Sequence, residues 1–280
     1  IEFLSMKSGE KAFQLVRLRE IDDVIRSAVS KRVNTKKRHE VDENWTAIVN
    51  KAFGEINKDD IDEATARKEK AAVLKELAEA RLSVLIGGAG TGKTTLLSLL
   101  CTSEIIKNGG ILLLAPTGKA RVKMSQAMSE RGVKANAKTV AQFLISNGRF
   151  DFNTMQYQLS DTPARDVPDT VIIDECSMLT EEMFGALLQA LRSAGRIILV
   201  GDPNQLPPIG VGRPFVDLVR YLSKDLPAYC SPRVTRSFGE LKITRRQKAN
   251  GLSERLDTEL SKWYVDGAFQ LDESVFEKLQ

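Results

Sequence analysis

The sequence predicts an α/β fold in which a central, mainly parallel sheet is flanked by helices. Four short apolar runs have the pattern of strands that are buried on both faces: 82–87, 111–115, 170–174 and 196–201. Between these runs lie three stretches with apolar residues at helical spacing: 93–107, 118–131 and 180–193. Strands that alternate with helices in this way are typical of a parallel sheet covered by helices on both sides.

The chain before the first strand divides into two parts. Residues 1–61 are charged and weakly patterned, and we expect them to form a small, mostly helical N-terminal segment. Residues 62–81 contain neither Pro nor Gly and have apolar residues at helical spacing, which predicts a helix. This helix would open the main domain, which we expect to span 62–250.

Two further segments depart from the alternation. The stretch "GRFDFNTMQYQLSD" (148–161) places aromatic and apolar residues on both sides of an Asn-Thr centre, which predicts a β-hairpin inserted into the main domain. Residues 251–280 are expected to form a C-terminal helical segment.

The composition indicates a globular protein, with 42% hydrophobic and 28% charged residues among 280. Three widely spaced cysteines argue for a reducing compartment, for which we expect the cytoplasm, and against a disulfide framework. The single histidine, His39, argues against a zinc site or a His-dependent triad. No run has the roughly eighteen apolar residues of a transmembrane helix, and no signal-peptide pattern opens the chain. Because the chain begins at Ile1, we expect it to be a piece of a longer protein.

Basic side chains gather in two windows. One contains Lys119, Arg121, Lys123, Arg131, Lys134 and Lys138, and the other contains Arg233, Arg236, Lys242, Arg245, Arg246 and Lys248. Such clusters suit an anionic polymer. The alternative for each is a solvated helix face.

The stretch "GGAGTGKTT" connects the first expected strand to a helix and matches the phosphate-binding loop G-x-x-x-x-G-K-[ST]. Glycines allow the backbone to turn tightly and to direct N–H groups inward, and the helix start favours negative charge. Lys93 would reach the β- and γ-phosphates of ATP, and Thr94 would bind Mg²⁺. The nucleotide-binding residues predicted here are Gly87, Gly88, Ala89, Gly90, Thr91, Gly92, Lys93, Thr94 and Thr95.

Two later strand ends carry the remaining polar groups of this predicted site. Asp174 ends the run "TVIID", where its carboxylate could hold Mg²⁺ together with Thr94, and Glu175 could orient or deprotonate an attacking water. The alternative for this pair is a helix N-cap. Gln205 follows the strand end Gly201-Asp202 and precedes two prolines, where its amide could sense a γ-phosphate. The alternative for this stretch is a structural turn.

The motifs "GGAGTGKTT", "APTGKAR", "VIIDECSML" and "GDPNQLPPIGVG" together resemble the first motor domain of superfamily 1 DNA helicases of the RecD-like, 5′–3′ branch, with part of the region that precedes it. The resemblance covers roughly residues 65–250. It implies a RecA-like P-loop NTPase fold and an ATP hydrolase that uses Mg²⁺ and moves along single-stranded DNA to unwind duplex junctions. It assigns catalytic roles to Lys93, Asp174, Glu175 and Gln205.

The same resemblance implies which residues face DNA. It assigns Pro116, Thr117, Lys119 and Arg121 to backbone contacts, and Thr139 to the next DNA-contacting motif, in which Ala141 stands where relatives often have His. The hairpin at 148–161 lies where RecD-like helicases carry a strand-separating pin. Its alternative is an ordinary surface hairpin.

Three features qualify the resemblance. Arg246, in "GELKITRRQ", would be the cationic partner of the γ-phosphate, with Arg245 as the competing candidate. Glu69 stands at the position where relatives often use a Gln to recognise adenine. The chain ends soon after the Arg246 motif, so we expect it to hold most of one of the two motor domains, with weak or no hydrolysis in isolation.

Two other functions remain open from the sequence. One is an ATP-gated module that binds single-stranded DNA without hydrolysis on its own. The other is a P-loop kinase for a small molecule, in which "GDPNQLPP" and the hairpin would have no role.

Overall fold

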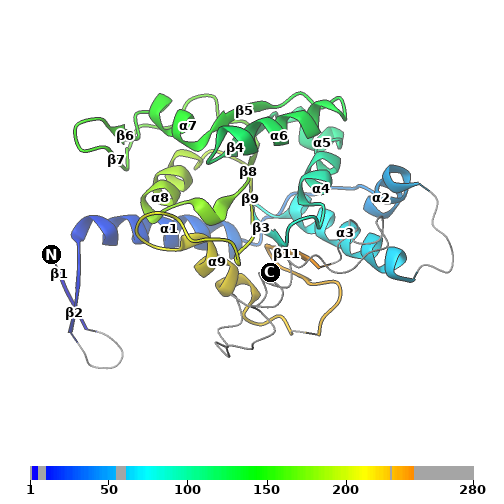
Figure 1. Cartoon of the computed structure of the whole chain (residues 1–280), viewed down its shortest axis with the longest axis horizontal. Helices are drawn as coiled ribbons and strands as arrows, with labels where there is room; N and C mark the ends of the chain where they lie inside the picture. Colours follow the sequence, from blue (N-terminus) through cyan, green and yellow to red (C-terminus); the bar gives the residue numbers. More distant parts are fainter. Residues whose placement is uncertain (1, 6–10, 55–60, 228, 243–280) are drawn as a thin grey trace, which may run out of the picture. The chain divides into compact units, whose positions relative to one another are not determined.

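The computed structural model describes residues 2–5, 11–54, 61–227 and 229–242, and its centre is a twisted, mainly parallel sheet (Figure 1). Within these residues the sheet has seven strands in the order β10-β11-β3-β9-β8-β4-β5. Their bounds are β3 (Leu82–Gly87), β4 (Ile111–Ala115), β5 (Asn136–Thr139), β8 (Thr170–Ile173), β9 (Arg196–Gly201), β10 (Val234–Thr235) and β11 (Phe238–Leu241). Each adjacent pair is parallel except β10 and β11. The expected fold class is confirmed.

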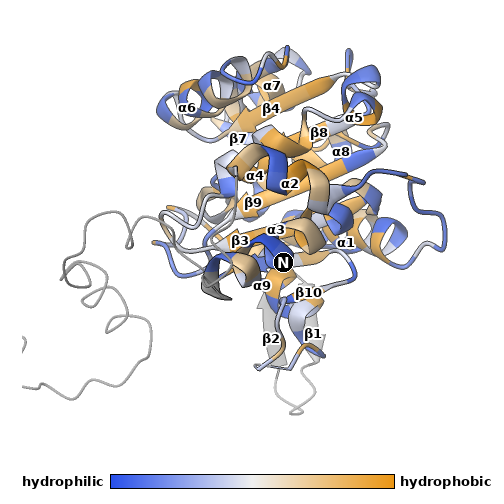
Figure 2. Cartoon of the chain, turned by 90° about the vertical axis from the view of Figure 1, so that its right-hand side faces the viewer, coloured by the Kyte–Doolittle hydropathy of each residue, from blue (hydrophilic) through white to orange (hydrophobic). Residues whose placement is uncertain are grey.

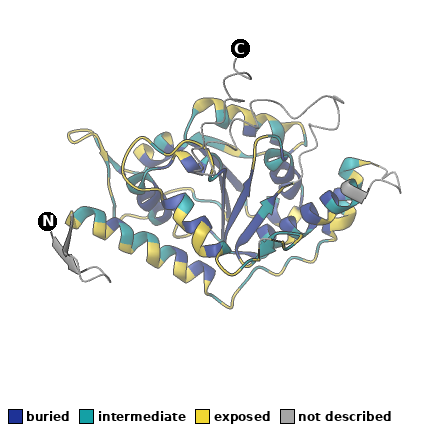
Figure 3. Cartoon of the chain, turned by 60° about the horizontal axis from the view of Figure 1, so that its bottom comes forward, coloured by how far each residue is buried: buried dark blue, intermediate teal, exposed yellow. Residues whose placement is uncertain are grey.

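The central strands send alternate side chains into two separate hydrophobic cores. In β3, Val84 and Ile86 belong to one core and Leu85 to the other. Figure 2 shows these strands as apolar ribbons between the helices, and Figure 3 shows them buried. A strand buried on both faces needs apolar residues at every position, which explains the continuous runs in the sequence.

Helices cover both faces of the sheet. Those that share the core of Val84 are α1 (Val16–Val33), α7 (Val140–Ser146), α8 (Glu181–Ala190) and α9 (Pro214–Ser223). Those that share the core of Leu85 are α2 (Trp45–Phe53), α3 (Ile61–Glu79), α4 (Lys93–Leu100), α5 (Glu104–Asn108) and α6 (Gly118–Ser129). None of the helices in the described part of the chain is long and apolar enough to cross a membrane.

The helices expected at 62–81, 118–131 and 180–193 are confirmed as α3, α6 and α8. The helical stretch expected at 93–107 is divided into two helices, because the chain leaves α4 after Leu100 and begins α5 at Glu104. The hydroxyl of Thr102 donates to the Leu99 carbonyl (2.7 Å), and that of Ser103 donates to Glu43 (2.7 Å). Such local side-chain hydrogen bonds compete with continuation of a helix.

The described residues before the main sheet form the strand pair β1 (Glu2–Ser5) and β2 (Lys11–Gln14) and the helices α1 and α2. Helix α1 lies against α8, where a Cβ added at Gly185 would come within 2.7 Å of the Ile21 side chain. The buried Arg32 donates to the carbonyls of Ala194 (2.8 Å) and Leu191 (3.0 Å), beyond the end of α8. The domain boundaries at residues 61, 62 and 250 stay predictions, and 251–280 lies outside the described residues.

The expected hairpin is present but short. Strands β6 (Phe150–Asp151) and β7 (Gln156–Tyr157) pair antiparallel, with Phe150 opposite Tyr157. The Phe150 ring packs edge-on against the rings of Phe152 and Tyr157, both at 5.1 Å between centroids. At the base, Arg17 of α1 donates to the Tyr157 carbonyl (2.9 Å) and pairs with Glu182 of α8 (3.0 Å).

Candidate active site and nucleic-acid edge

The expected phosphate loop lies between β3 and α4. Gly90 and Gly92 have φ angles of 82° and 90°, a left-handed conformation in which side chains with a Cβ are strained. A Cβ at Gly87 would lie 2.8 Å from the Leu241 carbonyl oxygen in the neighbouring strand β11. The glycines therefore serve both the turn itself and the close approach of two strands.

Helix α4 begins at this loop without a side-chain cap. Its N-cap is Gly92, whereas α6, α7 and α8 begin with capping threonines at 117, 139 and 180. The first N–H groups of a helix need an acceptor, and the helix dipole favours a negative one. An anion in the loop would supply that acceptor, which fits a nucleotide phosphate.

The ammonium group of Lys93 lies inside the loop. It donates to the carbonyl oxygens of Gly87 and Gly88, the latter at 3.1 Å. Burial lowers the pKa of Lys93, and the charges of Asp202, Asp174 and Glu175 act in the opposite direction. An ammonium group held by backbone carbonyls among three carboxylates is placed to exchange those partners for phosphate oxygens.

The carboxylates around Lys93 come from the two strands next to β3 on one side. Asp174 and Glu175 directly follow β8, and Asp202 directly follows β9. Because the strands are parallel, their carboxyl ends meet at one edge of the sheet, where ligands of α/β proteins bind. This edge brings Lys93 and the acid pair together.

Glu175 has an unusual backbone conformation. Its φ of 54° is left-handed, and its N–H donates to Oδ1 of Asp174 (2.9 Å). Burial raises the pKa of Asp174, and burial followed by the charge of Asp174 raises the pKa of Glu175. Strained residues with perturbed pKa values are concentrated at functional sites.

Asp202 is a site residue that the sequence reasoning did not select. It is 9% exposed, and its charge raises the pKa of Lys93 more than the charge of Asp174 or of Glu175 does. Its Oδ1 accepts from the N–H of Asn204 (3.0 Å) and its carbonyl from the N–H of Gln205 (3.2 Å). Its position directly after a buried strand, like that of Asp174, was the available signal.

Gln205 is exposed on the loop after Asp202. In the described part of the chain, no hydrogen bond joins its side chain to the group around Lys93. Gln205 therefore lies at the same edge of the sheet as Lys93, but its side-chain amide makes no hydrogen bond with the described residues around Lys93. Arg246 and its competitor Arg245 lie outside the described residues.

The residues expected to face DNA lie at the adjacent part of the same edge. Pro116 and Thr117 follow β4, Thr139 ends β5, and the register pairs Ala115 with Thr139. The Thr117 and Thr139 hydroxyls cap α6 and α7, accepting from the N–H groups of Ala120 (3.2 Å) and Gln142 (3.1 Å). The sequence reasoning did not identify this capping role.

The basic residues of α6 differ in their surroundings. Lys119 is exposed, whereas Arg121 is half-buried and its Nε has no hydrogen-bond partner in the described structure. The charge of Lys123, further along α6, lowers the pKa of both Asp174 and Glu175. Helix α6 thus carries positive charge both at the expected DNA edge and towards the acid pair.

The second basic window serves a different purpose where the structure describes it. Arg233 pairs with Glu240 and donates to the Pro227 carbonyl (2.7 Å), and Arg236 donates to the Thr35 carbonyl. These guanidinium groups hold loops and strands of the chain in place. These two residues thus have a structural role, and their contact with an anionic polymer stays a prediction.

Glu69 is buried in α3, with 4% of its surface exposed. Its carboxylate accepts from the backbone N–H of Lys242 (3.2 Å), directly after β11. Since β11 pairs with β3 so that Leu241 lies opposite Gly87, Glu69 holds the strand next to the phosphate loop. This is a structural contact that the sequence alone did not indicate.

Comparison with known proteins identifies proteins that are similar to this chain. The model of a family described as "AAA domain" matches residues 69–211. A protein of Methanocaldococcus jannaschii is 28% identical over 272 residues, which cover 91% of this chain and 21% of that protein. The ATP-dependent RecD2 DNA helicase of Deinococcus radiodurans is 35% identical over 155 residues, which cover 55% of this chain and 20% of that helicase.

Among solved structures, that of the Pif1 helicase from Candida albicans matches with a TM-score of 0.37 and 17% identity. The match covers 70% of this chain and 42% of that chain. The chain spans about a fifth of the length of the two curated relatives above.

Proposed function

The chain belongs to the AAA domain family, as a motor domain of RecD-like superfamily 1 helicase type, and on this premise we propose that it binds and hydrolyses ATP to drive movement on single-stranded DNA. The observation that carries the proposal is that three carboxylates at the ends of β8 and β9 lie near enough to Lys93 for their charges to act on its ammonium group. A lysine in a glycine loop beside strand-end acids is the arrangement that phosphoryl transfer from ATP requires.

The roles follow from the chemistry of each group. Lys93 and the uncapped N–H groups of α4 hold the phosphates, in place of the Gly87 and Gly88 carbonyls that the ammonium contacts now. Thr94 and Asp174 supply the hydroxyl and carboxylate oxygens that Mg²⁺ prefers. When bound, Mg²⁺ neutralises charge on the phosphates.

The remaining groups act on the attacking water and on the γ-phosphate. Glu175 orients the water and accepts its proton, for which a raised pKa is favourable because it makes the carboxylate a stronger base. Gln205 contacts the γ-phosphate through its amide, which requires its exposed loop to close on the nucleotide. Arg246 supplies a cation there.

Single-stranded DNA is proposed to cross the ends of β4 and β5. Pro116, Thr117 and Thr139 lie at this edge beside Lys119 and Arg121, and we propose that these five residues contact the sugar-phosphate backbone. The proposed ATP site lies on the same edge of the sheet. Closure of the Gln205 loop on ATP can therefore change the contacts with DNA.

The β6–β7 hairpin is proposed to meet the duplex junction, because Phe152 and Met155 expose apolar side chains at its tip. Replacing both by Ser should leave ATP hydrolysis unchanged and slow the unwinding of a forked duplex by the complete helicase, since the bases lose an apolar surface against which to separate. A strand-displacement assay measures this. The exposed Ile105→Ser on α5 is the matched apolar control, and equal unwinding by the hairpin variant would make the hairpin a surface feature.

The primary test is MgATP binding and hydrolysis, measured with and without single-stranded DNA. Lys93→Ala should abolish both, because the phosphates lose their buried cation, whereas Lys107→Ala, on the neighbouring helix α5, should behave as the wild type. Wild-type turnover by Lys93→Ala would overturn the assignment of the loop.

A second candidate is an ATP-gated module that binds single-stranded DNA without hydrolysing ATP. DNA-stimulated hydrolysis by this chain would exclude that candidate. Binding of ATP and DNA without hydrolysis would support it.

A further inference from the structure

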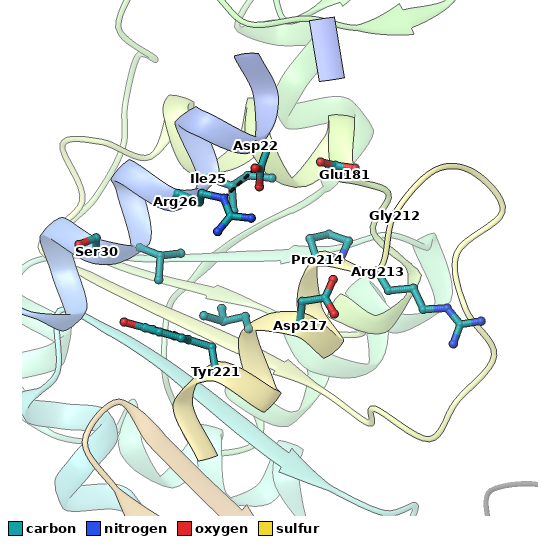
Figure 4. A pocket seen from close by; sticks show the side chains of 12 residues that line it. Asp22, Ile25, Arg26, Ser30, Glu181, Gly212, Arg213, Pro214, Asp217 and Tyr221 are labelled. Carbon is teal, nitrogen blue, oxygen red and sulfur yellow. Dashed lines mark hydrogen bonds and ion pairs between the residues drawn. The ribbon is translucent and has the colours of Figure 1, made fainter. Parts of the chain in front are cut away.

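A cavity of about 420 Å³ lies between α1, α8 and α9, on the side of the sheet that α4 and α6 do not cover (Figure 4). Its volume is within the range of ligand-binding pockets, roughly 300–1,000 Å³. Neither the phosphate loop nor the β4–β5 edge contributes to its lining. The cavity is therefore distinct from both sites described above.

Five of the residues that line this cavity are apolar. They are Ile25 and Val29 of α1 and Pro214, Leu218 and Tyr221 of α9. Val29 and Leu218 are buried, whereas Tyr221 is 46% exposed. These side chains offer apolar surface to the stem of an incoming side chain.

Three of the lining residues are acidic. They are Asp22 of α1, Glu181 at the start of α8 and Asp217 of α9. Arg26 is already paired with Asp22 (2.7 Å), and Figure 4 shows the Arg213 side chain extending away from the other labelled groups. The lining thus carries three carboxylates and two guanidinium groups, an excess of one negative charge.

Glu181 is the lining carboxylate for which no ion pair is found among the described residues. Burial raises its pKa, the charges of Asp22 and Asp217 raise it further, and the charge of Arg26 acts in the opposite direction. In the described part of the chain, no Lys or Arg lies within ion-pair distance of Glu181, whereas Asp217 pairs with Arg220 (3.7 Å). A cation placed beside Glu181 would relieve this repulsion.

The chemistry of the lining residues argues against several kinds of ligand. Nucleic acid would bring further negative charge. Within the described residues, no group of three or more acidic, His or Cys side chains is arranged to hold a metal ion. A free small cation would leave the five apolar side chains unused. A long side chain that carries its charge at the tip, as Arg and Lys do, matches both the apolar and the acidic residues of the lining.

We propose that this cavity receives an arginine or lysine side chain from an apolar segment of a partner protein, with the charged head beside Glu181 and the stem along α9. The Tyr221 ring lines the cavity and is partly exposed, and the neighbouring Lys224 ammonium already lies 5.5 Å from its centre. The ring is thus able to contact the cation of the incoming side chain through its face.

The test titrates the chain with two amidated peptides, acetyl-Leu-Arg-Leu and the same peptide with neutral citrulline in place of arginine, and follows backbone amide signals by NMR. The arginine peptide should shift the signals of Ile25, Gly212 and Leu218 saturably. Glu181→Gln should weaken this binding about fivefold, as expected for a partly exposed ion pair. Asp225→Asn, an exposed acid just beyond α9, should not change it.

Three outcomes would overturn the proposal: equal binding of the citrulline peptide, unchanged binding by Glu181→Gln, or arginine amide binding as tightly as the peptide. The last would indicate a site for free cations rather than for an apolar segment. Because the readout involves neither ATP nor DNA, failure of this proposal is distinguishable from failure of the proposed motor function.

Discussion

Glu175 combines a strained backbone with a carboxylate that is costly to ionise. A φ of 54° is uncommon for a residue with a side chain, and burial together with Asp174 disfavours the charged form. As pH rises above the ordinary pKa of Glu, the unfolded chain loses its proton before the folded chain does. Stability therefore falls through this window, and Glu175 destabilises the folded chain at neutral pH.

The prediction is that Glu175→Gln separates binding from hydrolysis. ATP should remain bound, hydrolysis should slow by about 10²–10⁴-fold because the proton acceptor is lost, and the midpoint of thermal unfolding without ligand should rise at pH 7. ATP turnover and calorimetry measure these changes. The control is Glu104→Gln, an exposed acid on α5, which should change neither. Hydrolysis at the wild-type rate would remove Glu175 from its role at the attacking water.

Sequence reasoning reached Lys93, Asp174 and Glu175 because the phosphate loop is local and because acids at the ends of apolar runs stand out. It could not reveal that Glu69 holds the N–H of Lys242, since the two residues are 173 positions apart and only folding brings them together. It also missed Asp202, whose role depends on β9 lying next to β3.

Threonines at the ends of β4 and β5 show how one side chain can serve an element and a site. Thr139 accepts from the N–H of Gln142 (3.1 Å), and the Gln142 side chain accepts from the N–H of Thr139 (2.9 Å), which completes a capping box. The cap fixes where β5 ends and α7 begins. It therefore also fixes the shape of the edge that we propose DNA follows.

We predict that Thr139→Ala lowers the free energy of unfolding by about 1 kcal/mol, the usual cost of a lost N-cap, and that Thr139→Ser restores most of it. Denaturant unfolding of the two variants measures this. If Thr139→Ala kept its stability and lost only DNA affinity, the hydroxyl would act as a DNA contact and not as a cap.

Element boundaries were predictable where hydrophobic pattern decided them, as in β3, β9 and α3. They were not predictable where local hydrogen bonds decided them, as at the break after α4, where Thr102 and Ser103 turn the chain. Strand β5 ("NAKT") carries no continuous apolar run because it is an edge strand with no buried position. The hydrophobic pattern therefore could not predict that this strand lies beside β4.

At the scale of the whole molecule, strand order determines which strand ends share a function. The sequence order of the strands does not reveal that β9 and β8 lie between β3 and β4. This order places the residues of the proposed ATP site at the ends of β3, β9 and β8, and the proposed DNA residues at the ends of β4 and β5. Helix α6 joins the two, because Lys119 lies at the DNA side while the charge of Lys123 reaches the acid pair.

The proposed DNA path makes a prediction about salt. Lys119 is exposed at the start of α6 and would neutralise a phosphate without reading a base. Lys119→Ala should weaken binding of oligo-dT and of a mixed-sequence strand by the same factor. It should also reduce the slope of log affinity against log salt by about 0.7, the value for one phosphate contact on a single strand.

Fluorescence anisotropy at several salt concentrations measures both quantities. Lys75→Ala removes an exposed lysine from α3, away from the β4–β5 edge, and should leave affinity and slope unchanged. A loss that depended on sequence would mean that Lys119 contacts a base. An unchanged slope would mean that the strand does not pass the start of α6, and the DNA path would have to be sought elsewhere along the edge.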